Sequence, residues 1–254
     1  MIIFRYENSF EGLLTLVFES YRLNLFPDKI VSDNESQTMI FSDTVSIVAD
    51  ERKAERVWKK IIEKSSKESA NMLQIVFLSE HPEASGLIYD FCRLMVEKPY
   101  NIETDFSLEP VLKLSRLFNK VAAETARVRM FTRFQETSEN TYYASFSPKY
   151  NVLPLCIQHF TDRFADQEWI IYDLKRNYGF YYNLIETVRI TFEELPANPE
   201  NGQIPESSKS ADEQHFQKLW KKYYDSISIV QRKNYRLHRQ RLPKRFWKYL
   251  PEKN

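Results

Sequence analysis

The chain has 254 residues, 43% of them hydrophobic and 15% aromatic, which is enough to bury a sizeable core in one large domain or two small ones. Only 4 residues are glycine, and the sequence contains neither GxGxxG nor GxxxxGK[ST], so a nucleotide site of either usual kind is not expected. No stretch approaches the roughly 18 apolar residues of a membrane span, and Arg5 and Glu7 interrupt the start before a signal peptide could form. We therefore expect a cytoplasmic protein with no membrane partner.

The cysteines and histidines lack the spacing of a metal site. Cys92 and Cys156 lie far apart, each in a helical pattern, and are expected to be buried, reduced thiols. The 4 histidines form neither HxH nor HxxxH. The sequence predicts no metal and no cofactor.

The first 126 residues are predicted to form a mainly helical region. Strands are expected over residues 1–6 and 44–49. A helix is expected over residues 10–23, because apolar residues recur there at helical spacing and Ser9 can cap it. The stretch 51–126 carries four further apolar stripes at helical spacing.

Residues 127–194 are predicted to form a β-rich centre that begins with a strand over residues 127–134. Side chains alternate along a strand, so Arg127, Arg129 and Arg133 would share one face. Arginine suits bidentate recognition of phosphate or carboxylate. That face could therefore bind a ligand, or it could form salt bridges to nearby carboxylates such as Glu124 or Glu186.

The remainder of this centre is predicted to be a helix and further strands. The helix covers residues 151–164, with Pro154 in its first turn. A strand over residues 169–174 leads through a turn into a hairpin, and Val188, Ile190 and Phe192 would alternate inward on the last strand. The predicted fold class is α+β, with a central antiparallel sheet and a crossing helix.

Residues 195–210 carry three prolines, a glycine and three serines, which is typical of a linker. A basic helical segment is expected over residues 211–254, opened by a capping box of Ser210 and Glu213. Its apolar face would comprise Phe216, Leu219, Trp220, Tyr223 and Ile227. Residues 226–254 hold nine Lys and Arg and one acid, a charge of +8, so the other 225 residues hold 27 bases and 34 acids, a charge of −7.

This basic segment is the strongest functional signal in the sequence. The candidate nucleic-acid contacts in it are Arg232, Lys233, Arg236, Arg239, Arg241, Lys244, Arg245 and Trp247. Outside it, the candidate nucleic-acid contacts are Arg127, Arg129, Arg133 and Arg163. Arg232, Arg236 and Arg239 recur at helical spacing, so one helix face could follow a phosphate backbone, while nearby aromatic rings could stack on unpaired bases. The alternatives are that the segment packs on the acidic remainder of the chain or binds another partner.

A second candidate cluster lies on the predicted helix 151–164. His159, Asp162 and Arg163 fall within one turn, and Asp173 could join them. A histidine oriented by a carboxylate can act as an acid or base near neutral pH. Such pairs are also common as structural hydrogen bonds, so the pattern leaves both catalysis and a structural role open.

Three separated stretches carry a family resemblance: FEGLL from Phe10; RVRMFTRF, YYASFSPKYNVLPLCIQHFTDRF and WIIYDLKR in the centre; and the ending from LWKKYYDSISIVQRKNY to LPKRFWKYLPE. Together they resemble a bacterial family labelled a DNA metabolism or DNA repair protein, whose members accompany a radical-SAM DNA modification protein. The resemblance marks, beyond the residues already named, Arg176, Asn234 and Pro243. This chain has no CxxxCxxC, so it would be the partner of the radical-SAM enzyme rather than that enzyme.

The sequence therefore predicts a protein that binds DNA or RNA within a repair or modification system, with a radical-SAM protein as its partner. Whether it is itself an enzyme stays open. One rival is a glycosylase- or nuclease-like enzyme that uses His159 and Asp173. The other is a structural adaptor whose basic segment binds a protein.

Overall fold

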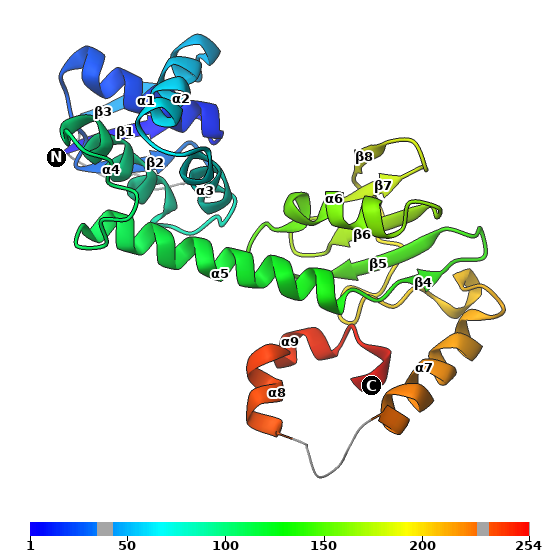
Figure 1. Cartoon of the computed structure of the whole chain (residues 1–254). Coiled ribbons are helices and arrows are strands. Elements are labelled where there is room, and N and C mark those ends of the chain that lie inside the picture. The colour runs from blue at the N-terminus through cyan, green and yellow to red at the C-terminus, as the bar shows by residue number, and fades with distance from the viewer. Residues whose placement is uncertain (35–42, 228–233, 254) are drawn as a thin grey trace. The chain divides into compact units, whose positions relative to one another are not determined.

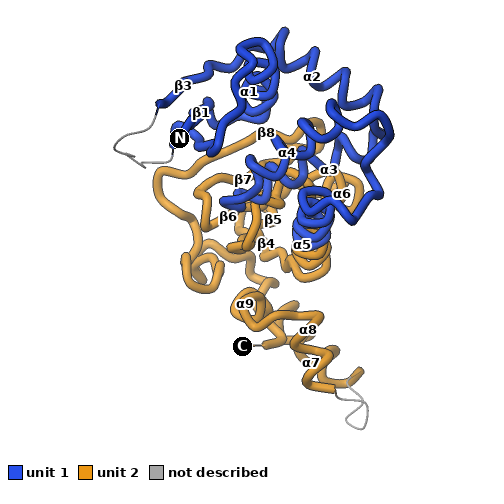
Figure 2. The backbone as a smooth tube through the Cα atoms, turned by 90° about the vertical axis from the view of Figure 1, so that its left-hand side faces the viewer, with its two compact units in different colours: residues 1–121 blue, residues 122–254 orange. Residues whose placement is uncertain are grey.

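The computed structural model describes residues 1–34, 43–227 and 234–253, and confirms the α+β class (Figure 1). The chain divides into two compact units, residues 1–121 and 122–254 (Figure 2). The boundary between them falls within a long helix, α5 (Glu109–Phe131). None of the described helices combines the length and the apolar character needed to cross a membrane.

Unit 1 contains a small parallel sheet that the prediction of a mainly helical region did not include. Its strands are β1 (Ile2–Tyr6), β2 (Lys29–Ser32) and β3 (Asp43–Ile47), in the order β2-β1-β3. β1 is central and pairs in parallel with both neighbours. Two of the strands were predicted individually, but their pairing depends on connections that periodicity does not reveal.

The helices of unit 1 agree with the predicted stripes. They are α1 (Phe10–Leu23), α2 (Glu51–Lys64), α3 (Lys67–Phe77), α4 (Ala84–Glu97) and the first part of α5. The Ser9 side chain accepts a hydrogen bond from the Gly12 N–H at 2.9 Å, which confirms the predicted cap of α1. A Cβ at Gly12 would collide with the carbonyl oxygen of Glu7, so only glycine fits this first turn.

The predicted strand over residues 127–134 is wrong, because α5 continues to Phe131. Val111, Leu114, Val121 and Val128 are all at most 1% exposed and recur at helical spacing, so one apolar stripe runs through the whole helix. The alternation that suggested a strand covers too few residues to outweigh that stripe. As a consequence, Arg127, Arg129 and Arg133 do not share a strand face.

Unit 2 is built on a five-stranded sheet in the order β4-β5-β6-β7-β8. The strands are β4 (Gln135–Glu136), β5 (Tyr142–Phe146), β6 (Trp169–Asp173), β7 (Tyr178–Tyr182) and β8 (Thr187–Ile190). The sheet is mixed rather than wholly antiparallel, because β5 and β6 pair in parallel. They are joined by α6 (Leu153–Arg163), which crosses the sheet with Pro154 in its first turn, as predicted (Figure 1).

Aromatic side chains fill the core between α6 and the sheet. Trp169 of β6 and Phe160 of α6 are each at most 1% exposed. The Trp169 ring lies 6.3 Å from the Phe160 ring and 5.3 Å from the Tyr182 ring. At the edge strand β8 the predicted inward alternation does not hold, since Val188 is 43% exposed.

Residues 195–210 pack against the sheet over part of their length. Ala197 and Ile204 are buried, in one cluster with Tyr143 and Tyr172. The side chain of Gln135 donates to the Gly202 carbonyl at 2.9 Å and accepts from the Ile204 N–H at 3.2 Å. A short 3-10 turn, η1 (Glu206–Ser208), follows. Whether this segment separates two domains stays a prediction.

The C-terminal segment forms several short elements instead of one long helix. They are α7 (Glu213–Ile227), α8 (Tyr235–Arg241), α9 (Lys244–Trp247) and the 3-10 turn η3 (Pro251–Lys253). Asn234 caps α8 by accepting from the Leu237 N–H at 2.9 Å, so a new helix begins there. The predicted capping box of Ser210 and Glu213 does not form.

The two residues of that box bind β4 instead. The Ser210 hydroxyl donates to a carboxylate oxygen of Glu136 at 2.8 Å, and Glu213 accepts from the Glu136 N–H at 3.0 Å. The start of α7 is therefore fixed to the sheet. The predicted apolar face of α7 is exposed, at between 38% and 58% for Phe216, Leu219, Trp220, Tyr223 and Ile227.

Candidate nucleic-acid interface

The parallel strands β5 and β6 end at the same edge of the sheet of unit 2. The loop after β5 (residues 147–152) and the turn after β6 (residues 174–177) therefore lie together. In open sheets with parallel strands, ligands bind outside the carboxyl ends of those strands. This edge is therefore where a binding site is expected.

Glu124 of α5 is a buried carboxylate beside this edge, and it contacts two arginines and a backbone N–H. Its side chain is 1% exposed. It accepts the Lys149 backbone N–H at 2.8 Å, an N–H of Arg245 from α9, and it pairs with Arg127 at 3.4 Å. The salt bridge from Arg127 to Glu124, one of the alternatives from the sequence, is thus confirmed. Glu124 joins three separate parts of the chain.

A second buried carboxylate, Asp173 at the end of β6, holds the neighbouring turn. It accepts from the Lys175 and Arg176 backbone N–H groups at 2.9 and 3.2 Å and from the Arg176 guanidinium at 2.9 Å. Burial raises the pKa of Asp173 above its usual value, against the opposing effect of Arg176. The hydrogen bonds from the two backbone N–H groups also act to lower this pKa.

Lys149 connects these two carboxylate sites. Its carbonyl oxygen accepts from the Lys175 ammonium at 3.3 Å and from the Arg176 guanidinium at 3.4 Å. We call the resulting group the strand-end cluster: Glu124, Arg127, Lys149, Asp173, Lys175, Arg176 and Arg245. Five cations meet two carboxylates, a net charge of +3. Lys149, Lys175 and Arg245 are exposed, so they can reach a polyanion in solvent.

Sequence reasoning did not find Lys149 and Lys175. Lys149 lies three residues after the end of β5 and Lys175 two residues after the end of β6, and this position shortly after a strand is the signal that could have found them. Its meaning depends on β5 and β6 being parallel, and an antiparallel pair would have put their carboxyl ends at opposite edges. Arg176 was marked only by the family resemblance.

The other two arginines of the supposed strand face have structural contacts. Arg129 donates to the Leu155 carbonyl of α6. Arg133 pairs with Glu252 at 2.8 Å and stacks over the Trp220 ring at 5.2 Å. Neither joins the strand-end cluster. Arg163 is exposed at the far end of α6.

The remaining predicted cations lie on the short C-terminal helices. Arg236, Arg239 and Arg241 of α8 are exposed, and none forms an ion pair within the described ranges. Arg232 and Lys233 lie outside the described residues. Lys244 lies 6.0 Å from the Trp247 ring, whose N–H donates to the Leu242 carbonyl at 3.1 Å.

The candidate catalytic residues are not assembled. Asp162 accepts from the Gln158 amide at 2.7 Å, and Asp173 is held by Arg176. His159 contacts only the Phe160 ring, at 5.3 Å, among the contacts of the described residues. Nothing in this geometry orients the imidazole as an acid or base.

Over the described part of the chain, no three His, Cys, Asp or Glu side chains gather as a metal site. Cys92 and Cys156 are buried and unpaired, as predicted. Burial raises the pKa of both thiols to about 12, so neither is a thiolate near neutral pH.

Comparisons with known proteins give one family and one distant structural likeness. A search of curated proteins finds no match. Among solved structures, a pGpG-specific phosphodiesterase, PggH from Vibrio cholerae, aligns with 89% of this chain and 99% of its own at 10% identity and a TM-score of 0.30. A TM-score this low does not establish a common fold. The model of a domain of unknown function, DUF4130, matches residues 82–252, and the chain therefore belongs to the DUF4130 family.

Proposed function

We propose that this chain binds DNA or RNA through unit 2 and works in a DNA repair or modification system beside a radical-SAM protein. The observation that carries the proposal is the strand-end cluster, where five cations exceed two carboxylates at the carboxyl ends of β5 and β6. The carboxylates fix Arg127 and Arg176, while Lys149 and Lys175 are exposed. Positioned cations of this kind suit phosphate contacts that are independent of base sequence.

The exposed arginines of α8 support the same proposal. Arg236 and Arg239 are three residues apart and share a face of the helix. Arg245, in the next helix, belongs to the strand-end cluster through its ion pair with Glu124, so α9 connects α8 to α5. A phosphate backbone that meets the cluster would then encounter further cations along the C-terminal segment.

The proposed role beside a radical-SAM protein rests on the family resemblance and on an exposed apolar stripe of α7. The exposed stripe of α7 presents Leu219 and Tyr223 to solvent. Large apolar stripes on a surface helix are typical of protein interfaces. Leu219→Ser and Tyr223→Ser should reduce the amount of the radical-SAM protein that co-purifies with the chain. If none of it co-purifies with the unaltered chain, this part of the proposal is wrong.

A salt titration tests nucleic-acid binding. Labelled single- and double-stranded DNA and RNA would be titrated with the protein at several salt concentrations. The variant with both Lys149→Ala and Lys175→Ala should bind more weakly, and its slope of log affinity against log salt on duplex should be shallower by about 1.8. These truncations leave in place the hydrogen bonds from the Lys149 N–H to Glu124 and from Arg176 to the Lys149 carbonyl.

The matched control is Lys120→Ala, an exposed lysine of unit 1 outside the cluster. It should leave the slope unchanged. If the unaltered protein binds none of these nucleic acids at low salt, the proposed function is wrong. If it binds but both variants behave alike, the strand-end cluster is not the interface.

A further inference from the structure

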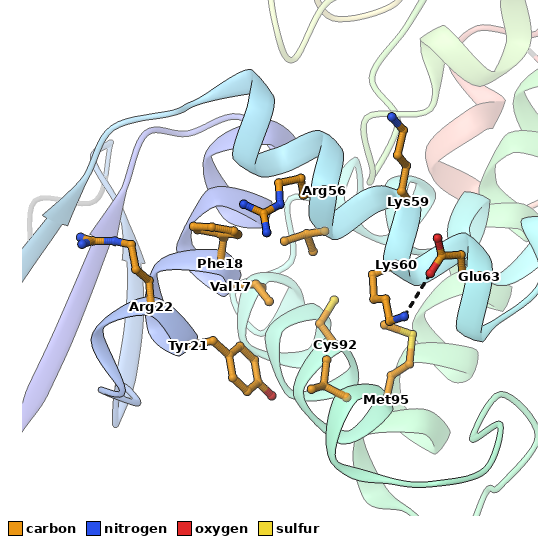
Figure 3. A pocket seen from close by; sticks show the side chains of 12 residues that line it. Val17, Phe18, Tyr21, Arg22, Arg56, Lys59, Lys60, Glu63, Cys92 and Met95 are labelled. Carbon is orange, nitrogen blue, oxygen red and sulfur yellow. Dashed lines mark hydrogen bonds and ion pairs between the residues drawn. The ribbon is translucent and has the colours of Figure 1, made fainter.

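Unit 1 contains a cavity of about 670 Å³ between α1, α2 and α4, shown close up in Figure 3. Its floor consists of Val17, Cys92 and Met95, each at most 3% exposed. The volume falls within the roughly 300–1,000 Å³ of ordinary small-molecule sites. Nothing in the proposed nucleic-acid function uses this cavity, and α1 and α2 precede the residues that match the family.

The lining restricts the body of a ligand to apolar groups. All the lining residues belong to helices, whose interior backbone groups bond within the helix. The hydroxyl of Tyr21 is directed to the Arg93 carbonyl, at 3.5 Å. A base or a sugar placed on this floor would leave its polar atoms without partners, which is costly. An aliphatic chain carries no such cost.

The rim of the cavity is cationic. Arg22, Arg56, Lys59 and Lys60 stand around the floor with one carboxylate, Glu63. Three of these cations already pair: Arg22 with Glu19, Lys59 with Glu55, and Lys60 with Glu63.

Arg56 differs from the other three cations of the rim. Its guanidinium lies 5.0 Å from the centre of the Phe18 ring, and it forms no ion pair within the described residues (Figure 3). The ring holds the guanidinium beside the apolar floor and leaves its N–H donors open. An anionic group at this point would obtain charge-assisted hydrogen bonds.

We infer that the cavity of unit 1 binds a single-chain amphiphile with an aliphatic body and a carboxylate or phosphate head group. The chain lies on Val17, Cys92 and Met95, and the head group binds Arg56. Lys60 can leave its salt bridge with Glu63 and bind the same anionic head group instead. The ligand site belongs to unit 1 alone, so it is independent of the proposed binding of nucleic acid by unit 2.

Calorimetric titration with three ten-carbon probes, each below its critical micelle concentration, tests the inference. Decanoate and decyl phosphate share the apolar body of decanol but carry the anion. One or both should bind at least tenfold more tightly than decanol, as expected for a charge-assisted hydrogen bond. Comparison of the two acids identifies the head group.

Variants assign the effect to the cavity. Arg56→Glu should weaken the better anionic probe at least tenfold, and Arg56→Lys should retain most of the affinity. Lys120→Glu makes the same charge change on an exposed part of unit 1 and should bind like the unaltered protein. Arg56 is exposed, so thermal unfolding should verify that each variant remains folded.

Three results would overturn the inference: no binding of either acid, equal affinity for the acids and decanol, or equal weakening by Arg56→Glu and Lys120→Glu. Since the probes carry no nucleic acid, failure here leaves the salt titration of unit 2 unaffected. Conversely, if the protein binds decanoate but neither DNA nor RNA, the inferred cavity site is supported and the proposed function is wrong.

Discussion

At the scale of single residues, Glu124 is the acceptor on which the strand-end cluster depends. Its side chain is 1% exposed and pairs with two arginines, Arg127 one turn along α5 and Arg245 of α9. Glu124→Gln keeps the shape but removes the charge, so Arg127 and Arg245 lose their partner. Both arginines are partly exposed and can regain water, so we expect a loss of about 1–3 kcal/mol of unfolding free energy. Urea denaturation measures it.

The control for that measurement is Glu139→Gln, which removes an exposed carboxylate from the turn between β4 and β5. Its stability should stay within about 0.5 kcal/mol of the unaltered protein. If Glu124→Gln is as stable as this control, the cluster does not depend on its buried carboxylate.

At the scale of elements, Glu252 joins the end of α5, α7 and η3. It accepts from the Arg133 guanidinium at 2.8 Å and from the Trp220 indole N–H at 2.9 Å. Burial acts to raise the pKa of Glu252, but the hydrogen bonds from its own backbone N–H, Trp220 and Arg133 outweigh it and leave the pKa below the usual 4.5. The folded protein then binds this proton less readily than the unfolded chain does.

That difference sets the direction of a pH effect. The stabilising contribution of Glu252 is present in full above about pH 4.5 and declines as the pH falls toward the folded-state pKa. Melting temperatures between pH 3 and 7 should therefore show Glu252→Gln less stable near neutral pH and approaching the unaltered protein in acid. A difference that stays constant with pH would mean that the carboxylate charge is not what joins these elements. Glu200→Gln, at an exposed site, serves as the control.

At the scale of the whole chain, we propose that residues 195–210 remain a boundary between the sheet of unit 2 and its C-terminal helices. Glu200 and Glu206 are exposed, whereas Ala197 and Ile204 are buried. A protease that cleaves after glutamate should therefore cut after Glu200 or Glu206 before it cuts within residues 127–192, because exposed backbone is cut most readily. Mass spectrometry of the first fragments identifies the sites.

A substitution makes the same test more specific. Ile204→Asp should release the segment from Tyr143 and Tyr172 and accelerate cleavage there, since a buried carboxylate without a partner is costly. First cleavage inside residues 127–192 in the unaltered protein would contradict the boundary.

The sequence by itself determined the elements whose signals are local. α1 begins and ends at the predicted residues, because Ser9 supplies the cap and the apolar stripe sets the length. The α+β class followed in the same way, since each helix and most strands carry their own periodicity. The burial of Cys92 and Cys156 also follows from such local patterns.

Only the tertiary structure decided which charged residues meet. The hydrogen bond between Arg245 and Glu124 spans 121 positions of the chain, and nothing in either neighbourhood specifies the other. Lys149 and Lys175 come together because β5 and β6 pair in parallel through α6, a choice made by packing of the whole sheet. The end of α5 was likewise predicted wrongly. Its last residues lie within eight that alternate as in a strand, but the buried stripe from Val111 to Val128 keeps them in the helix. Local periodicity determines a helix or a strand. A site made of charged residues that are distant in sequence forms only when the tertiary structure brings them together.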